Sequence, residues 1–188
     1  MSSDRREEIL RAALRLIGSR GMHHVTHRDV AAEAGVPLGS TTYYFATKEE
    51  LLSEALKLFV AEEQARLHAA AELFEGVSAP PTVIVDAIAS EIGNTLTRFA
   101  EQVAQFELYL EATRTPALAE VAKASFASYE EIAVAALRSG GAKDPERLAP
   151  LFIGLIEGLM FRQLVDPRSD WVDAVLKPQI LALFEAVG

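Results

Sequence analysis

The sequence predicts an all-α protein of about nine helices, and three observations support this. Apolar residues recur at the three- and four-residue spacing of amphipathic helices, between segments marked by Gly and Pro. No run of alternating, β-branched residues typical of a strand interrupts the pattern. The chain has 188 residues, 50% of them hydrophobic, which is enough to bury a substantial core.

The first helices are expected to be short and closely spaced. One is predicted over residues 5–19. Thr26, with Asp29 three residues later, has the pattern of an N-terminal capping box for a second helix over residues 27–34. A Gly-containing turn then leads to a third helix over residues 38–44. Two short helices joined by such a turn are typical of a helix-turn-helix that binds double-stranded DNA.

A second group of helices follows. Thr47 and Glu50 form another capping-box pattern, which opens a long amphipathic helix over residues 47–74. Further helices are expected at about residues 82–99, 101–113, 117–139, 145–165 and 171–187. Pro178 should kink the last helix or mark its true start, because proline lacks a backbone N–H.

Two domains are expected, a DNA-binding domain over residues 1–46 and a second helical domain over residues 47–188, with the helix over 47–74 joining them. Charge is distributed unevenly along the chain. Residues 1–50 carry seven cations and seven anions, so residues 51–188 carry the whole net charge of −9. The neutral first part tolerates a polyanion such as DNA, whereas the acidic remainder does not.

Several classes of protein are disfavoured by composition. The chain has no cysteine, which excludes disulfides and thiolate metal sites. Its first residues are mostly charged, unlike a signal peptide. The most apolar stretch, residues 148–161, contains Pro150 and Glu157 and is too short to span a bilayer. We therefore expect a cytoplasmic protein with no membrane partner.

Four runs of sequence agree in residue type and spacing with one known DNA-binding domain: Val25-Thr26-His27-Arg28-Asp29-Val30-Ala31, Ala34-Gly35-Val36, Gly39-Ser40-Thr41-Thr42-Tyr43-Tyr44-Phe45 and Lys48-Glu49-Glu50-Leu51-Leu52. Together they resemble the N-terminal domain of TetR-family transcriptional regulators, over about Ile9 to Leu56. The resemblance implies a homodimeric, ligand-responsive regulator. It would repress from a pseudo-palindromic operator until a small-molecule inducer releases it, although activation is equally compatible with the sequence.

The resemblance also implies which residues contact DNA. Phosphate contacts are expected from Thr26, Arg28, Tyr43 and Lys48, and base reading from Leu38, Gly39, Ser40 and Thr42. The full expected set is Thr26, His27, Arg28, Pro37, Leu38, Gly39, Ser40, Thr41, Thr42, Tyr43, Tyr44, Thr47 and Lys48. Pro37 and Thr42 depart from the common family residues, Ser and Tyr. Which of Thr42, Tyr43 and Tyr44 reaches the bases stays open.

Three histidines, His23, His24 and His27, lie close together in the same region. Imidazoles at short spacing can bind a metal. With no cysteine in the chain and no nearby fixed carboxylate, a loop that approaches phosphate is the preferred interpretation. We expect no metal and no cofactor.

The last two expected helices have the pattern of a dimer interface. The helix over residues 145–165 is apolar around most of its circumference, so it must be buried on more than one side. Gly154 and Gly158 share one face and permit close helix approach. The interface is expected to include Gly154, Leu155, Gly158, Trp171, Val175, Leu176 and Leu183. The alternative is that both glycines admit a bulky neighbour within the subunit.

A ligand pocket is expected among aromatic and apolar residues of the central helices. Its candidates are Phe99, Val103, Phe106, Tyr109, Leu110, Phe126, Tyr129, Phe152 and Met160, any of which can instead be plain core. Nearby polar side chains that could orient a largely apolar effector are Gln102, Glu107, Glu111 and Gln163.

No catalytic constellation is present in the sequence. It contains no H-E-x-x-H, no P-loop and no G-x-G-x-x-G motif, so an enzyme is not expected. The alternative function is a helical small-molecule binding or catalytic bundle with a vestigial helix-turn-helix, which the even charge balance of residues 1–50 would fit.

Overall fold

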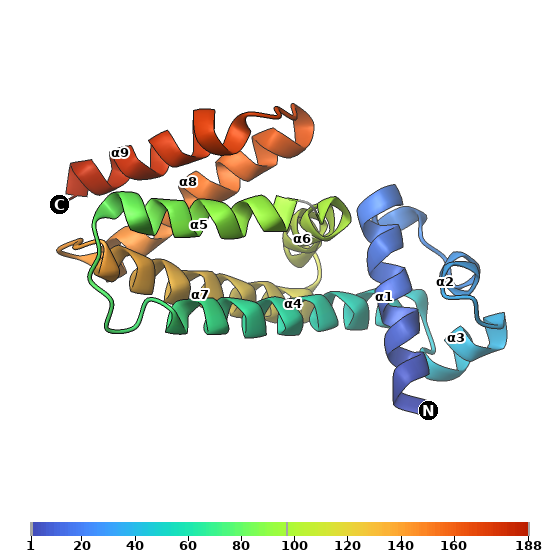
Figure 1. Ribbon diagram of the computed structural model, residues 1–188. Coiled ribbons are helices and arrows are strands. Elements are labelled where there is room, and N and C mark those ends of the chain that lie inside the picture. Colours follow the sequence, from blue (N-terminus) through green and yellow to red (C-terminus); the bar gives the residue numbers. More distant parts are fainter. Residues whose placement is uncertain (1, 97, 188) are drawn as a thin grey trace. The chain divides into compact units, whose positions relative to one another are not determined.

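The computed structural model describes residues 2–96 and 98–187 (Figure 1). These residues form nine α-helices and no strand, which confirms the all-α prediction. The helices are α1 (Ser2–Arg20), α2 (His27–Glu33), α3 (Leu38–Tyr44), α4 (Lys48–Glu72), α5 (Pro81–Leu96), α6 (Phe99–Ala112), α7 (Pro116–Ser139), α8 (Pro145–Val165) and α9 (Lys177–Val187). Two shorter elements accompany them, the 3-10 turn η1 (Met22–His24) and the π-helix η2 (Val172–Leu176).

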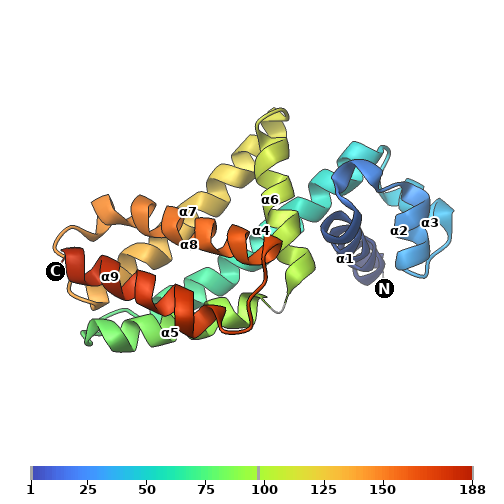
Figure 2. The same ribbon diagram turned by 90° about the horizontal axis from the view of Figure 1, so that it is seen from above.

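The helices pack into two compact units. Unit 1 comprises residues up to 63 together with 98–124, and unit 2 comprises 64–97 and 125–188. The helices α4 and α7 each contribute residues to both. In unit 1, α6 packs extensively on α1, although the sequence assigned α6 to the second domain (Figure 2).

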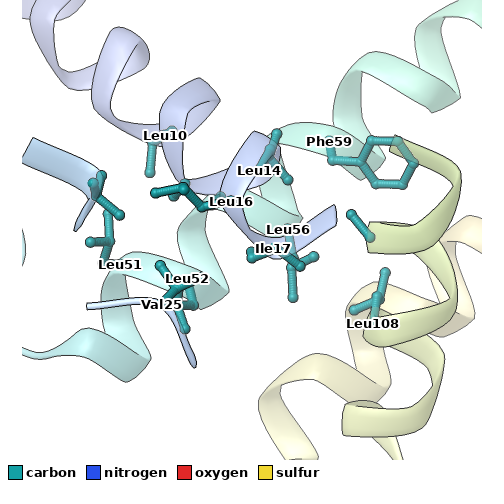
Figure 3. Close-up of a cluster of buried hydrophobic side chains, with 14 of the residues drawn as sticks. Leu10, Leu14, Leu16, Ile17, Val25, Leu51, Leu52, Leu56, Phe59 and Leu108 are labelled. Carbon is teal, nitrogen blue, oxygen red and sulfur yellow. The ribbon is translucent and has the colours of Figure 1, made fainter. Parts of the chain in front are cut away.

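The core of unit 1 surrounds α1. Ile9 and Ile17 of α1 are fully buried, as are Leu51 and Leu56 of α4, and Leu108 of α6 joins the same cluster (Figure 3). The buried positions of α1 recur at helical spacing, so one side of the helix meets α4 and α6 while its charged side stays in solvent. This packing holds the helix-turn-helix as part of a larger body.

The core of unit 2 forms where α5, α8 and α9 meet the second half of α7. Trp171, Leu176 and Phe184 are buried together with Phe152, whose ring lies 6.3 Å from that of Phe184. Ser139, at the end of α7, closes the unit: its hydroxyl donates to the carbonyl of Phe74 at 2.8 Å.

The chain before Pro178 adopts a π-helix instead of the expected continuous α-helix. Over η2 the backbone widens, and the N–H of Lys177 donates to the carbonyl of Val172, five residues earlier. Proline has no N–H to donate and its ring crowds the carbonyl four residues before it. A π turn in front of Pro178 accommodates both effects, and α9 then begins at Lys177.

The helix α8 is longer than the apolar stretch within it. It has 21 residues, and its most apolar window reaches a mean hydropathy of 1.5, so by length and composition alone it could cross a membrane. The expectation from residues 148–161 is corrected on this point, because the continuous helix is long enough. One face of α8 packs in the core of unit 2 through Leu148, Ala149 and Phe152, while only 22% of the apolar window is buried. The opposite face is therefore both apolar and open.

Candidate nucleic-acid interface

The first helix of the helix-turn-helix begins at the predicted capping box. The N–H of Asp29 donates to Thr26 Oγ1 at 3.2 Å, and the N–H of Thr26 donates to Asp29 Oδ2 at 3.0 Å. Hydrogen bonding from the Thr26 side chain is the main reason that the pKa of Asp29 is lowered. Two backbone N–H groups at the N-terminus of α2, those of Thr26 and Asp29, thus have local hydrogen-bond acceptors, and this fixes where the helix starts.

A tight turn ends α2 and directs the chain into α3. The N–H of Val36 donates to the carbonyl of Ala31 at 2.9 Å, and the N–H of Gly35 donates to that of Ala32 at 3.3 Å. These two bonds form a Schellman motif, which needs a left-handed residue after the helix. Gly35, with φ of +66°, supplies it.

The second helix, α3, presents most of its expected contact residues to solvent. Leu38 is 43% exposed and Tyr43 is 83% exposed. Pro37, Gly39 and Thr42 are exposed as well, and Ser40 is half-buried. The exposed face of α3 therefore offers small, apolar and hydroxyl groups together, the mixture that reads base edges in a groove.

Two residues of α3 differ from the expectation. Thr41 was expected at the DNA interface but is fully buried, and its hydroxyl donates to the carbonyl of Leu38 at 2.9 Å. It belongs to the core between the helices and is removed from the contact set. Tyr44 is half-buried and packs toward Phe45 and the core of unit 1, whereas the Tyr43 ring extends into solvent.

The start of α4 lies beside the turn η1. Thr47 Oγ1 accepts the N–H of Glu50 at 3.0 Å, while the Glu50 carboxylate accepts the N–H of Ala46 at 2.7 Å, one residue earlier than a regular capping box requires. Lys48 donates from Nζ to the carbonyl oxygen of His23 at 2.7 Å. An expected phosphate ligand and the histidine turn therefore share one small surface.

Most arginines near the helix-turn-helix are already paired. Each contacts a carboxylate, at 2.8 Å for Arg6 with Glu54, 2.7 Å for Arg11 with Glu7 and with Glu62, 2.8 Å for Arg15 with Glu33 and 3.5 Å for Arg20 with Asp29. Within residues 2–96 and 98–187, Arg28 and Lys48 form no ion pair with a carboxylate. Arg28 lies in the first turn of α2 and Lys48 is the first residue of α4, both at positions where the resemblance implied phosphate contacts.

Two carboxylates of α6 face the turn η1, a contact that sequence reasoning missed. The N–H of Met22 donates to Glu107 Oε2 at 3.4 Å, and His23 Nε2 lies 3.8 Å from Glu111 Oε2. Both had been considered as groups that orient a ligand. They are 85 and 88 residues from their partners in sequence, so no local pattern could reveal the contact.

The expected pocket residues are distributed over both units. In unit 1, Phe99 and Leu110 are exposed, and Val103, Phe106 and Tyr109 are half-buried. In unit 2, Phe126 is exposed, Tyr129 and Met160 are half-buried, and Phe152 lies in the hydrophobic core. In α6 the rings of Phe106 and Tyr109 pack edge to face at 6.3 Å. Their role toward a ligand stays a prediction.

Two of the polar side chains considered for the ligand have the following surroundings, and their role toward a ligand stays a prediction. Gln163 holds the turn after α8 by accepting the N–H of Arg168 at 3.0 Å and donating to its carbonyl at 2.9 Å. Gln102 is 2% exposed, inside unit 1. Among the described residues, no three His, Asp or Glu side chains gather as a metal site would require.

The expected interface residues fall into two sets. Gly154 and Gly158 are exposed on α8, and Leu155, Val175 and Leu183 are half-buried. Trp171 and Leu176 are 3% and 0% exposed, so they are corrected to core residues of unit 2. Three large apolar side chains outside the expected set, Leu151, Phe161 and Val165, are also more than half exposed on α8. An open groove of about 500 Å³ lies along Phe161, Val165 and Val175.

Family models match most of the chain. Residues 9–55 match the model described as bacterial regulatory proteins, tetR family, and residues 79–186 match the tetracyclin repressor-like C-terminal domain. Among curated relatives, the transcriptional regulator PksA of Bacillus subtilis is 46% identical over 54 residues, which are 29% of this chain and 26% of PksA. The chain is thus aligned with only about a quarter of the length of such relatives.

Other relatives align along nearly the whole chain. BetI of Rhizobium meliloti is 30% identical over 170 residues, covering 87% of this chain and 79% of BetI. Among solved structures, a putative transcriptional regulator from Saccharomonospora viridis in complex with choline is 27% identical with a TM-score of 0.76, covering 97% of this chain and 96% of that one. The multidrug binding protein EbrR complexed with ethidium is 30% identical with a TM-score of 0.68, covering 98% of both chains.

Proposed function

Because this chain belongs to the TetR family of bacterial regulatory proteins, we propose that it is a ligand-responsive transcriptional repressor which binds a pseudo-palindromic operator as a homodimer. The main observation behind the proposal is the exposed surface of α3, where Tyr43 is 83% exposed. In the sequence Tyr43 lies between Arg28 and Lys48, two cations that form no ion pair with a carboxylate among the described residues. A family helix-turn-helix with its reading face open and unpartnered is suited to DNA. Such a regulator acts in the cytoplasm, where its operator lies.

The DNA-contacting residues divide by chemistry. We assign Leu38, Gly39, Ser40 and Thr42 of α3 to base edges in the major groove, because they are small or apolar and accessible. The backbone contacts are assigned to Thr26, His27, Arg28, Tyr43, Thr47 and Lys48. Since only a few cations are unpaired, hydroxyl groups must carry part of the phosphate binding.

The homodimer is proposed to form through the open face of α8. Leu151, Gly154, Gly158, Phe161 and Val165 follow one another at intervals of three and four residues, which places them on one seam. A Cβ added to either glycine would meet no atom within 4 Å, so the centre of the seam is unoccupied by the chain's own side chains.

The seam is self-complementary under a two-fold axis. An axis near Ile156 pairs Leu151 with Phe161 of the partner subunit, and Gly154 with Gly158 of the partner subunit. Large side chains then flank a centre made only of glycine, where two helix backbones can approach closely. The same pairing would cover the groove beside Phe161 and Val165.

We assign the effector to the class of organic cations with an apolar body. Structural relatives are described in complex with choline, ethidium and proflavin, and a relative from Paenarthrobacter nicotinovorans is named nicotine-responsive. The acidic charge of residues 51–188 favours a cation over an anion. On α6, Phe106 and Tyr109 place two aromatic rings side by side, and aromatic rings attract positive charge.

Selection from a random double-stranded DNA library tests the proposal. The purified chain should enrich a pseudo-palindrome whose half-sites lie one helical turn, about 34–36 Å, or a multiple of it apart. Choline, nicotine and ethidium are then titrated against the complex, and one of them should release the DNA. Enrichment of no sequence would overturn the regulator, whereas enrichment without release by any cation would overturn only the effector class.

A further inference from the structure

The turn η1 carries two adjacent histidines beside a candidate phosphate ligand. His23 and His24 are both exposed, and Lys48 Nζ bonds the carbonyl of His23 at 2.7 Å. Building on the proposed DNA binding, we propose that η1 is a proton-dependent part of the interface. Protonated His24 binds a DNA phosphate beside Lys48, and protonated His23 holds the turn against α6 through Glu111.

The charge balance of residues 1–50 makes these protons effective. Four arginines of the first fifty residues are engaged with carboxylates, and residues 1–50 have no net charge while their histidines are neutral. Phosphate binding depends on cations that displace counterions from the DNA. Each proton that η1 takes up therefore adds one positive charge to a region with few cations left to bind phosphate, and this is a large increase.

His24 is the member of the pair that is free to meet a phosphate. Its side chain forms no hydrogen bond or ion pair within the part of the chain that the structure describes. Histidine titrates near neutral pH, and a phosphate oxygen close by favours the charged imidazole. Binding of DNA and uptake of a proton by His24 therefore reinforce each other.

His23 has a different partner, on α6. Its Nε2 lies 3.8 Å from Glu111 Oε2, and the Glu111 side chain is only 16% exposed. Glu111 is already oriented, because its other oxygen accepts the Thr115 hydroxyl at 2.9 Å. A protonated His23 adds an ion pair to Glu111, and the His23 carbonyl accepts a hydrogen bond from Lys48. His23 is therefore a residue that positions Lys48 and does not itself contact DNA.

Charged side chains of α4 and α6 contact η1. Lys48 Nζ lies 2.7 Å from the His23 carbonyl oxygen, Glu107 Oε2 accepts the N–H of Met22 at 3.4 Å, and Glu111 Oε2 lies 3.8 Å from His23 Nε2. Arg114 lies 3.8 Å from Glu111, and the neighbouring helices α1 and α2 carry Arg20 and Asp29, which pair with each other at 3.5 Å, and Arg28. Among the described residues, Glu111 is the carboxylate that lies within ion-pair distance of the His23 ring.

The experiment measures affinity for a fluorescent random-sequence duplex of about 30 base pairs, near pH 6 and near pH 8, across salt concentrations of about 50 to 200 mM. The full chain should bind more tightly near pH 6, by up to about tenfold per pH unit for each proton taken up. His24→Gln should remove most of that gain and lower the salt slope by about 0.9 near pH 6 only. His24→Arg should give the low-pH affinity at both values.

A second set of variants separates the positioning role proposed for His23 from the phosphate contact proposed for His24. His23→Gln and Glu111→Gln should each reduce the pH dependence without changing the salt slope, and the double variant should lose no more than either single one. His68→Gln is the matched control: it removes the fourth histidine, in unit 2 beside Glu131, and should behave as the unaltered chain.

Three outcomes overturn the inference. They are an affinity that is equal at both pH values, a pH dependence that His24→Gln leaves intact, and additive effects of His23→Gln and Glu111→Gln. Failure to bind any duplex at either pH would instead contradict the proposed function, which is DNA binding by a transcriptional regulator. Urea unfolding of every variant confirms that the exposed substitutions leave the fold intact.

Discussion

Gly18 in α1 lies directly against the backbone of Ala100 in α6. A Cβ built on Gly18 would lie 2.0 Å from the carbonyl oxygen of Ala100 and 2.6 Å from its Cα. Backbone atoms cannot move aside as a flexible side chain can, so only glycine permits this approach. The contact brings α6 onto α1 and, through Glu107, onto the turn that precedes the helix-turn-helix.

Gly18→Ala should therefore destabilise unit 1. The added methyl forces the two helices apart at a cost of about 1–3 kcal/mol, against a gain of up to about 1 kcal/mol in helix propensity. Urea unfolding measures the net loss. Gly93→Ala is the matched control, because its Cβ would make only an ordinary contact at 3.7 Å with Val172 Cγ2 and should be stabilising. Equal stability of the two variants would contradict the steric argument.

Thr26→Ala should destabilise α2 by about 1 kcal/mol, because the N-cap hydroxyl is lost. Thr26→Ser keeps the hydroxyl and serves as its control. Both proteins are compared by thermal unfolding at neutral pH. A Thr26→Ala variant as stable as Thr26→Ser would show that the bond from the Asp29 N–H to Thr26 Oγ1, at 3.2 Å, contributes nothing.

Acid should weaken the same capping box. Because the pKa of Asp29 is lowered in the folded chain, chiefly by the hydrogen bond from Thr26, its ionised form stabilises the fold. This contribution is complete above the pKa of an unfolded aspartate and is lost as pH falls through the lower, folded value. Tm measured from neutral pH downward should fall less steeply for Asp29→Asn. An identical slope would place the acid sensitivity elsewhere, for example at Glu54, whose pKa is also lowered, chiefly by its hydrogen bond with Lys57.

Lys48→Gln should weaken DNA binding uniformly across sequences and reduce the salt slope by about 0.9, the value for one phosphate contact. Lys57→Gln is its control, because Lys57 lies further along α4 and pairs with Glu54 at 2.8 Å. Fluorescence anisotropy at several salt concentrations gives both slopes. A salt slope that Lys48→Gln leaves unchanged would remove Lys48 from the interface.

Tyr43→Ala should lower operator affinity more than Tyr44→Phe does. The Tyr43 ring is 83% exposed, whereas Tyr44 packs on the core of unit 1. Loss of one such contact corresponds to about 1–3 kcal/mol, or roughly five- to 150-fold in affinity. Electrophoretic mobility shifts on the selected operator make the comparison. The reverse order of effects would assign the DNA contact to Tyr44.

If the proposed dimer forms through α8, Phe161→Glu should dissociate it, because the substitution places a charge in the proposed α8 seam. Gly154→Ala should weaken the dimer while leaving the folded subunit at least as stable, since nothing lies within 4 Å of the added Cβ. Val83→Glu, at a site on α5 that is 55% exposed, controls for the added charge. Sedimentation velocity gives the oligomeric state. A dimer unaffected by both α8 substitutions would place the interface elsewhere.

Local features of this protein could be predicted because their causes lie within a few residues. The capping box of Thr26 and Asp29 spans four residues, and the turn after α2 depends on the left-handed conformation of Gly35. The periodicity of apolar residues likewise gave nearly all helices to within a few positions. Even Pro178 was recognised as a break, although the form of the break, a π-helix, was not.

What only the tertiary structure decided concerns partners far apart in the chain. Sequence spacing could not show that Thr41 faces the core while Tyr43 faces solvent, because both lie on a helix with hydroxyl groups all around it. It could not show that Trp171 fills the core of unit 2 whereas Phe161 is 52% exposed on α8.

The sequence by itself thus determined that this chain has a helix-turn-helix, where it begins and where it turns. The contact of Gly18 with Ala100, and of Met22 with Glu107, was decided by how α6 packs on α1. The physical reason is the range of the interactions: capping and turn hydrogen bonds are encoded by neighbouring residues, whereas close packing depends on the shapes of surfaces that the folded chain alone brings together.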